Sequence, residues 1–205
     1  NESTLSIQVT PVDDAFSDAD ESVTIDEDSG LHSGTLLGGT SSVDGPVTVQ
    51  SFSVNGTTYT FSASNTSFTV ALTAGSLVIN QDGTYSFTPA ANWNGTVPPV
   101  SYTLTDGSST NESTLSIQVT PVDDAFSDAD ESVTIDEDSG LHSGTLLGGT
   151  SSVDGPVTVQ SFSVNGTTYT FSASNTSFTV ALTAGSLVIN QDGTYSFTPA
   201  ANWNG

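Results

Sequence analysis

An exact internal repeat is the feature that most constrains the fold. Residues 1–95 and 111–205 have the same sequence, so the repeat has a period of 110 residues. This period is far longer than a solenoid unit and matches the size of one autonomous domain. The sequence therefore predicts tandem copies of one domain. Such an array suits a spacer, which gains length with each copy, better than an enzyme.

The repeat boundaries do not coincide with the ends of the sequence. The segment at residues 5–9 recurs at residues 115–119, just before an acidic linker. We expect residues 1–11 to be the last strand of a preceding repeat and residues 12–121 to be a complete repeat. Residues 122–205 are then a second repeat, truncated before its final two strands. Residues 4–10 of a neighbouring identical repeat, arranged head to tail, could fill part of that gap.

Apolar and polar residues alternate along almost the whole repeat, which predicts about nine short strands and no helix. Val23 and Ile25 share one face of such a strand. In the stretch 47–54 the alternation breaks, so we expect a β-bulge near Gln50-Ser51. Inward residues spread over so many strands require two packed sheets. The predicted fold is all-β, with tandem immunoglobulin-like (cadherin-like) β-sandwich domains.

Turn and loop residues divide these strands. Asn55-Gly56 predicts a type I′ hairpin, and Asp82-Gly83 is a second type I′ candidate. Trp93 is expected to cap one end of the core. His32 is expected in a loop, and a single His per repeat gives no basis for a Ser-His-Asp triad.

Acidic residues are concentrated in one window of each repeat. Eight of the twelve carboxylates in residues 12–121 lie between Asp13 and Asp28, and the chain has no Lys or Arg, which gives a formal charge of −23. Like charges about 6 Å apart repel by roughly 1 to 3 kcal/mol per pair near a protein surface. Packing them together requires an external cation. Oxygen ligands without Cys and almost without His favour Ca²⁺.

The candidate calcium ligands lie in the linkers and at the ends of the repeats. One cluster joins Glu27 and Asp28 of one repeat to acidic residues of the next linker. The full predicted set is Asp13, Asp14, Asp18, Asp20, Glu27, Asp28, Asp106, Asp123, Asp124, Asp128, Asp130, Glu137 and Asp138. Asp44 and Asp106 each precede a Gly and are open between ligand and turn residue, whereas Asp82 is expected to form a turn. The alternative is that all these charges are solvated linker residues.

The composition excludes several functions. Without basic residues the chain has no means of neutralising nucleic-acid phosphates or of contacting an anionic membrane directly. Without Cys it has no disulfide, thiol catalysis or thiolate metal site. We find neither a signal peptide nor a run of about 18 apolar residues, although a longer parent chain could carry an export signal elsewhere. Carboxylate pairs in a linker, away from any cleft, do not predict glycoside hydrolysis, so an enzyme is not expected.

Four motifs resemble the cadherin-like repeats of giant bacterial RTX adhesins, and the match covers the whole repeat. They are Pro11-Val12-Asp13-Asp14-Ala15, Asp26-Glu27-Asp28, the stretch Gly83–Gly95 (GTYSFTPAANWNG), and Tyr102-Thr103-Leu104-Thr105-Asp106-Gly107. The resemblance implies a calcium-stiffened extender in a secreted adhesin at the bacterial cell surface. Phe16 stands where the family linker usually has Pro.

Two functions follow as hypotheses. The first is a spacer that holds terminal ligand-binding domains of the same parent chain away from the cell, in adhesion or biofilm formation. The second is a ligand-binding module for carbohydrate, protein or ice that uses Thr- and Ser-rich strand faces. Homotypic adhesion between arrays is a third possibility, and it requires an exposed apolar patch.

Overall fold

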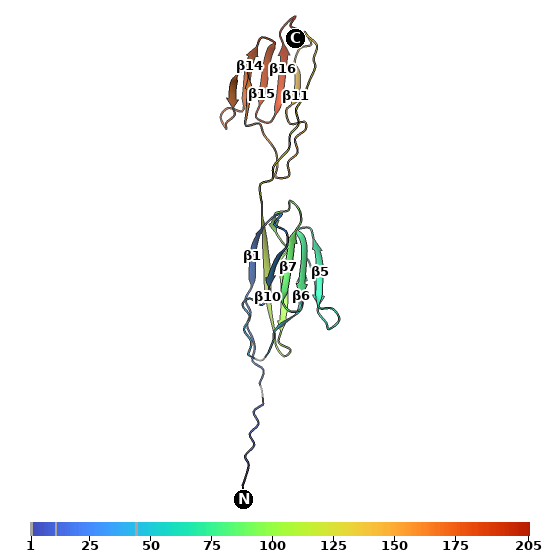
Figure 1. The fold of residues 1–205 in the computed structure, drawn as a ribbon, viewed down its shortest axis with the longest axis vertical. Helices are drawn as coiled ribbons and strands as arrows, with labels where there is room; N and C mark the ends of the chain where they lie inside the picture. The colour runs from blue at the N-terminus through green and yellow to red at the C-terminus, as the bar shows by residue number, and fades with distance from the viewer. Residues whose placement is uncertain (1, 11, 44) are drawn as a thin grey trace. The chain divides into compact units, whose positions relative to one another are not determined.

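A computed structural model describes residues 2–10, 12–43 and 45–205, and the chain divides into two compact units, Asn1–Val122 and Asp123–Gly205 (Figure 1). The elements found among the described residues are strands, so the predicted all-β class is confirmed. Within the described part of the chain, no helix is present that could span a membrane.

The first sheet of the first unit contains six strands. Its main order is β1-β10-β9-β3-β4, and β8 pairs with β10. The first and last strands along the chain, β1 and β10, pair in parallel, whereas the other pairs are antiparallel. The strands are β1 (Glu21–Asp26), β3 (Thr48–Val54), β4 (Thr57–Thr60), β8 (Gly95–Thr96), β9 (Val100–Thr105) and β10 (Thr110–Thr120).

The second sheet has the order β2-β7-β6-β5 and is antiparallel throughout. Its strands are β2 (His32–Thr35), β5 (Ser67–Leu72), β6 (Gly75–Asn80) and β7 (Thr84–Pro89). Fully buried side chains from both sheets form one core cluster, with Phe52 and Tyr102 from the first sheet and Leu77 and Phe87 from the second. Trp93 packs against this cluster while partly exposed. The expected loop position of His32 was wrong, because His32 pairs with Phe87 at the start of β2.

The local signals for the bulge and one hairpin are confirmed. The β3–β9 register shifts between Val49 and Ser51, and Asn55 and Gly56 both have positive φ (50° and 74°), as a type I′ turn requires. The type I′ prediction at Asp82-Gly83 was wrong. Three residues, 81–83, connect β6 to β7, and only Gly83 of this pair has positive φ, at 87°. The Asp82 side chain instead accepts hydrogen bonds from Thr84.

The second unit forms two smaller sheets. A four-stranded sheet has the order β11-β16-β15-β14 and matches the second sheet of the first unit, and β12 pairs with β13 as a hairpin. The strands are β11 (His142–Thr145), β12 (Ser161–Val164), β13 (Thr167–Thr170), β14 (Ser177–Leu182), β15 (Gly185–Asn190) and β16 (Thr194–Pro199).

Identical sequences differ in structure between the two units. Residues 131–136 repeat the sequence of β1 but form no strand, and no described segment pairs with them as β10 pairs with β1. Phe16 is 6% exposed, whereas its counterpart Phe126 is 56% exposed. Phe52 is fully buried, whereas its counterpart Phe162 is only half-buried. The second unit therefore has an open core.

The segment at residues 2–10 shows the same dependence on a partner. It repeats the sequence of residues 112–120 within β10, yet it forms no strand. Leu5, Ile7 and Val9 are 76–87% exposed, whereas their counterparts in β10 are at most 2% exposed. Pairing, and not sequence alone, makes this segment a strand.

This difference predicts that Ile117→Ala destabilises the first unit by about 2 to 5 kcal/mol, the usual cost of removing a buried Ile side chain. The matched control Ile7→Ala removes the same side chain from a solvated segment and is expected to change stability by less than about 0.5 kcal/mol. Denaturant unfolding of the chain in dilute solution measures both. Equal effects at the two positions would contradict the structure.

Candidate functional site

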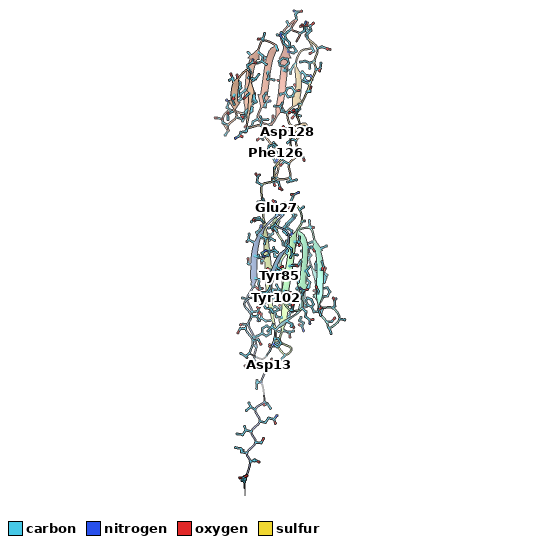
Figure 2. The ribbon with its side chains drawn as sticks, viewed as in Figure 1. Asp13, Glu27, Tyr85, Tyr102, Phe126 and Asp128 are labelled. Atoms are coloured by element: carbon cyan, nitrogen blue, oxygen red, sulfur yellow. The ribbon has the colours of Figure 1, made fainter. Side chains whose placement is uncertain are left out.

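Acidic residues gather toward both ends of the first unit. Asp13 and Glu27 lie toward opposite ends of this unit, and Tyr85 and Tyr102 lie between them (Figure 2). The linker leads into β1, whose C-terminal end is followed directly by Glu27 and Asp28. The strand β1 thus separates two groups of carboxylates that are close in sequence.

The linker carboxylates at the first end are held by protein donors. Asp18 Oδ1 accepts a hydrogen bond from Thr40 Oγ1 at 2.6 Å, and Asp18 Oδ2 lies 3.1 Å from the Tyr102 hydroxyl. Asp20 Oδ1 accepts a hydrogen bond from the Thr114 backbone N–H at 2.8 Å. These contacts attach the linker to β9 and β10.

Glu21 belongs to this group, although the sequence analysis did not include it among the ligands. Its Oε2 lies in close hydrogen-bond contact with the Tyr102 hydroxyl, which is shared with Asp18. Burial raises the pKa of Glu21, hydrogen bonds from Tyr102 and the Gly38 backbone oppose the shift, and the charges of Asp18 and Asp20 add to it. Burial and the nearby Glu21 carboxylate also raise the pKa of Tyr102 and Tyr85.

One sequence signal could have identified Glu21. Tyr102 is at an inward position of a predicted strand, and a buried tyrosine hydroxyl needs a polar partner. Glu21 is the first residue of β1 and directly follows the acidic residues of the linker. Pairing with Leu115 of β10 therefore places Glu21 at the edge of the core, beside Tyr102.

At the other end of the first unit, Glu27 is 2% exposed. Its Oε1 accepts a hydrogen bond from the Val122 backbone N–H at 2.8 Å, and its Oε2 accepts one from Asn94 Nδ2 at 3.3 Å. Asp28 Oδ1 accepts a hydrogen bond from the Asn92 backbone N–H at 3.1 Å. The structure thus brings Glu27 and Asp28 together with the loop before β8 and with the chain that leaves β10.

The second unit reproduces some of these contacts. Asp128 Oδ1 accepts a hydrogen bond from Thr150 Oγ1 at 2.6 Å, and Asp138 Oδ1 accepts one from the Asn202 N–H at 3.1 Å. Glu137 is exposed, because its counterpart Glu27 depends on the chain after β10.

The remaining linker carboxylates differ in their surroundings. The Asp124 N–H donates to Asp154 Oδ2. Asp44, the counterpart of Asp154, lies outside the described residues. The side chains of Asp13, Asp14, Asp123 and Asp130 are in exposed positions.

Asp106 lies in the turn between β9 and β10. Its Oδ1 accepts hydrogen bonds from the backbone N–H groups of Ser108 (3.0 Å) and Ser109 (2.8 Å), and these bonds hold the pKa of Asp106 below its usual value. Hydrogen bonds from Thr84 likewise lower the pKa of Asp82. No described contact joins Asp106 to the linker carboxylates, so the structure does not bring it into that group.

The donor chemistry of these groups fits Ca²⁺, since every charged candidate is a carboxylate and no thiolate is present. The arrangement of the described carboxylates, however, is not that of a preformed metal site. Among the described residues, no three or more Asp, Glu or His side chains converge as a metal centre requires. Asp18, Asp20 and Glu27 are instead directed at hydroxyl, amide and backbone donors. The assignment of individual calcium ligands therefore stays a prediction.

Two-sheet packing in the first unit, together with the tandem repeat, defines the class of immunoglobulin-like repeat domains. The model of the cadherin-like domain family matches residues 9–120, more than half of the chain, so the chain belongs to this family. Residues 141–202, which are identical to residues 31–92, match a bacterial Ig-like domain. No curated protein sequence matches the chain at a significant level. Both matched domains are non-catalytic, and they are consistent with repeats of a bacterial surface or secreted protein.

The position of Glu21 predicts a pH dependence of stability. A raised pKa in the folded state means that stability falls as pH rises from the unfolded value of about 4.3 through the folded value. Glu21→Gln removes this loss, so the variant should gain stability over the parent in that window. Denaturant unfolding from pH 3.5 to 7 in chelator measures the difference. Glu131→Gln is the control, because the Glu131 carboxylate is exposed and accepts its hydrogen bond from the Gly148 N–H. Parallel pH profiles for Glu21→Gln and its parent would contradict the assignment.

The burial of Glu27 predicts an asymmetry between the two copies. Glu27→Ala leaves the Val122 N–H and the Asn94 amide without their acceptor, at a cost of about 1 to 3 kcal/mol. Glu137→Ala removes an exposed carboxylate and is expected to change stability by less than about 0.5 kcal/mol. Thermal unfolding in chelator compares them. If Glu137→Ala lowered the stability as much as Glu27→Ala, the first unit would not hold Glu27 as described.

Proposed function

We propose that the chain is a calcium-stiffened structural extender of a secreted bacterial surface adhesin, which holds a ligand-binding region away from the cell. The observation that carries this proposal is the parallel pairing of β1 with β10, in register from Glu21↔Leu115 to Asp26↔Thr120. The linker enters at the start of β1 and the chain leaves at the end of β10. Each complete unit therefore adds its length between entry and exit, as an extender requires.

The same pairing suits a load-bearing role. Tension on the two ends of the unit pulls two parallel strands in opposite directions, so the backbone hydrogen bonds between them are loaded together in shear. Leu115, Ile117 and Val119 are buried behind these bonds. Their contacts must break along with the hydrogen bonds before the unit can extend.

Calcium supplies the positive charge that the chain lacks. Near a protein surface each close carboxylate pair costs roughly 1 to 3 kcal/mol, and the linkers hold several such pairs without one Lys or Arg. The residues proposed to bind the ion are the linker carboxylates together with Glu27 and Asp28 and their counterparts. When bound, Ca²⁺ neutralises these carboxylates and restricts the linker. Without it, repulsion keeps the linker extended but free to bend.

Small-angle scattering of the chain with and without chelator tests this proposal. We expect a narrow distribution of dimensions in millimolar Ca²⁺ and a broader distribution, with a changed maximum dimension, after chelation. We also expect calcium to raise the unfolding temperature, since an ion at about 100 times its Kd adds about 2.7 kcal/mol to the folded state. An unchanged scattering profile would defeat the proposal.

A matched pair of variants separates specific binding from general screening of charge. A variant that carries Asp123→Asn, Asp124→Asn, Asp128→Asn and Asp130→Asn loses the carboxylates of the second linker and should show a reduced calcium response, with only the part due to residues 13–20 remaining. The matched variant carries Asp82→Asn and Asp192→Asn. It loses two turn-forming carboxylates and should keep the full calcium response. A second control replaces CaCl₂ with NaCl at the same ionic strength. Simple screening of charge would make both variants respond to either salt, whereas specific binding requires Ca²⁺.

A further inference from the structure

We propose that the edge strand β5, like its counterpart β14, pairs antiparallel with the same edge of a second copy of this chain. The four-stranded sheets of the two copies then join into one continuous sheet across the contact. The inference rests on an uncharged and unprotected sheet edge that is present in both units. It goes beyond the proposed extender role and does not depend on calcium.

The strand β5 forms one edge of the sheet β2-β7-β6-β5, and β14 forms the matching edge of the sheet β11-β16-β15-β14 (Figure 1). Among the described strands, β5 pairs only with β6, and β14 pairs only with β15. The outer side of an edge strand presents a row of backbone N–H and C=O groups, which is a template for pairing with another strand. Both units therefore present the same template.

The edge at β5 lacks the features that usually protect a sheet edge. Natural edges are short, charged, bulged or interrupted by Pro, and these features oppose pairing with another edge. In the first unit, β1 carries Glu21 and Asp26, whereas β2, β4 and β8 have at most four residues each. The strand β5 has six residues, Ser67–Leu72, without a charge or Pro, and its register with β6 runs without a bulge.

The distribution of charge favours a second copy of the chain as the partner. Residues 45–81 and the identical residues 155–191 contain no charged side chain, although the chain has a formal charge of −23. The strands β2, β5, β6 and β7 contain no Asp or Glu. Two such acidic chains repel least where their uncharged edges face one another. A basic partner would instead be attracted to the acidic linkers.

The side chains of β5 define how two identical strands fit together. Val70 is buried and Phe68 is half-buried, whereas Thr69 is exposed. Opposite residues of a strand pair lie on the same face, so inward residues must meet inward residues. A pair centred on Thr69 meets this condition, because Phe68 then lies opposite Val70 of the second copy. Thr–Thr and aromatic–β-branched pairs are favourable cross-strand contacts.

This contact requires no exposed apolar patch, because backbone hydrogen bonds between the two edges provide the pairing. The acidic surfaces outside the edges still repel one another. Salt screens this repulsion over about 10 Å at 0.1 M. Self-association should therefore increase with both protein concentration and ionic strength.

Sedimentation velocity over a concentration series in chelator measures this association. The parent chain should form concentration-dependent dimers and larger species. A variant with Thr69→Asp and Thr179→Asp places a charge on both edges and should lower the association constant about tenfold or more. The matched variant with Thr58→Asp and Thr168→Asp adds the same charges at exposed positions of β4 and β13 and should retain association.

A parent chain that stays monomeric at about 1 mM protein and about 0.5 M NaCl, where repulsion is screened, would overturn the proposal. Association that persists in the variant with Thr69→Asp and Thr179→Asp would place the contact elsewhere and would also overturn it. An equal loss in the two variants would do the same, because the contact would then not be specific to β5 and β14. Circular dichroism of both variants checks that their strands are retained.

Hydrogen–deuterium exchange tests the edge in the parent chain without any substitution. Association should slow the exchange of those amides in residues 67–72 and 177–182 that point away from β6 and β15, since they gain acceptors. Residues 57–60 of β4 are the internal control and should exchange at the same rate at low and high protein concentration. Concentration-dependent protection of β4 without protection of β5 would overturn the proposal.

Cysteine trapping tests the direction and register of the pair, since the parent chain has no Cys. A chain with Ser67→Cys mixed with a chain with Ala71→Cys should form disulfide-linked heterodimers under mild oxidation, because these positions are opposite in the pair centred on Thr69. The chain with Ser67→Cys alone is the control and should cross-link far less, since Ser67 meets its own counterpart only in a parallel pair. Equal yields from the two samples would overturn the proposal.

Repeating the sedimentation series in Ca²⁺ separates this inference from the proposed extender role. A chain that stiffens in Ca²⁺ but associates in neither condition would overturn this inference alone. Association in chelator without any effect of Ca²⁺ on the scattering profile would support this inference while defeating the proposed stiffening.

Discussion

Pairing of β10 with β1 on one side and with β9 on the other is the interaction on which the first unit depends. It buries Leu115, Ile117 and Val119 and joins the two ends of the repeat into one sheet. The second copy shows what the fold becomes without it. Its residues 131–136 form no strand, and Phe126 and Val133 are exposed by more than half. Sequence-local signals are the same in both copies, so the difference arises from long-range pairing alone.

The same strand pairing positions the carboxylates. Because β1 is fixed beside β10, the acidic residues before it and after it are carried to opposite ends of the unit. Neutral groups donate to several of the oxygens at each end, namely Thr40, Tyr102 and Thr114 at the first end and Asn92 and Val122 at the second. Glu21 Oε1 is buried without a hydrogen-bond partner. Neutral donors satisfy hydrogen bonding but leave the net negative charge in place. This residual charge is the physical reason for proposing a cation.

Features set by neighbouring residues were predictable from the sequence. Alternation indicated the strands, Asn55-Gly56 indicated its turn, and the broken alternation before Phe52 indicated the bulge. Features that depend on distant partners were not. His32 entered a strand because β7 was available to pair with it. Glu21 joined the acidic group because Tyr102, far away in sequence, reaches it from β9. The predicted ligand Asp106 shows the limit of composition, since backbone donors in its own turn hold its carboxylate.

Identical tandem repeats pose a problem of strand specificity, because residues 2–10 and β10 share a sequence that matches both copies of the β1 sequence. Covalent connection favours the strand within the same repeat by raising its effective concentration. Charge provides the second control. The edge strand β1 begins at Glu21 and ends at Asp26, and acidic residues at a sheet edge oppose pairing with another edge of the same kind. A chain with no basic residues cannot relieve this repulsion internally. The sheet edge at β1 therefore keeps this charge until a cation offsets it.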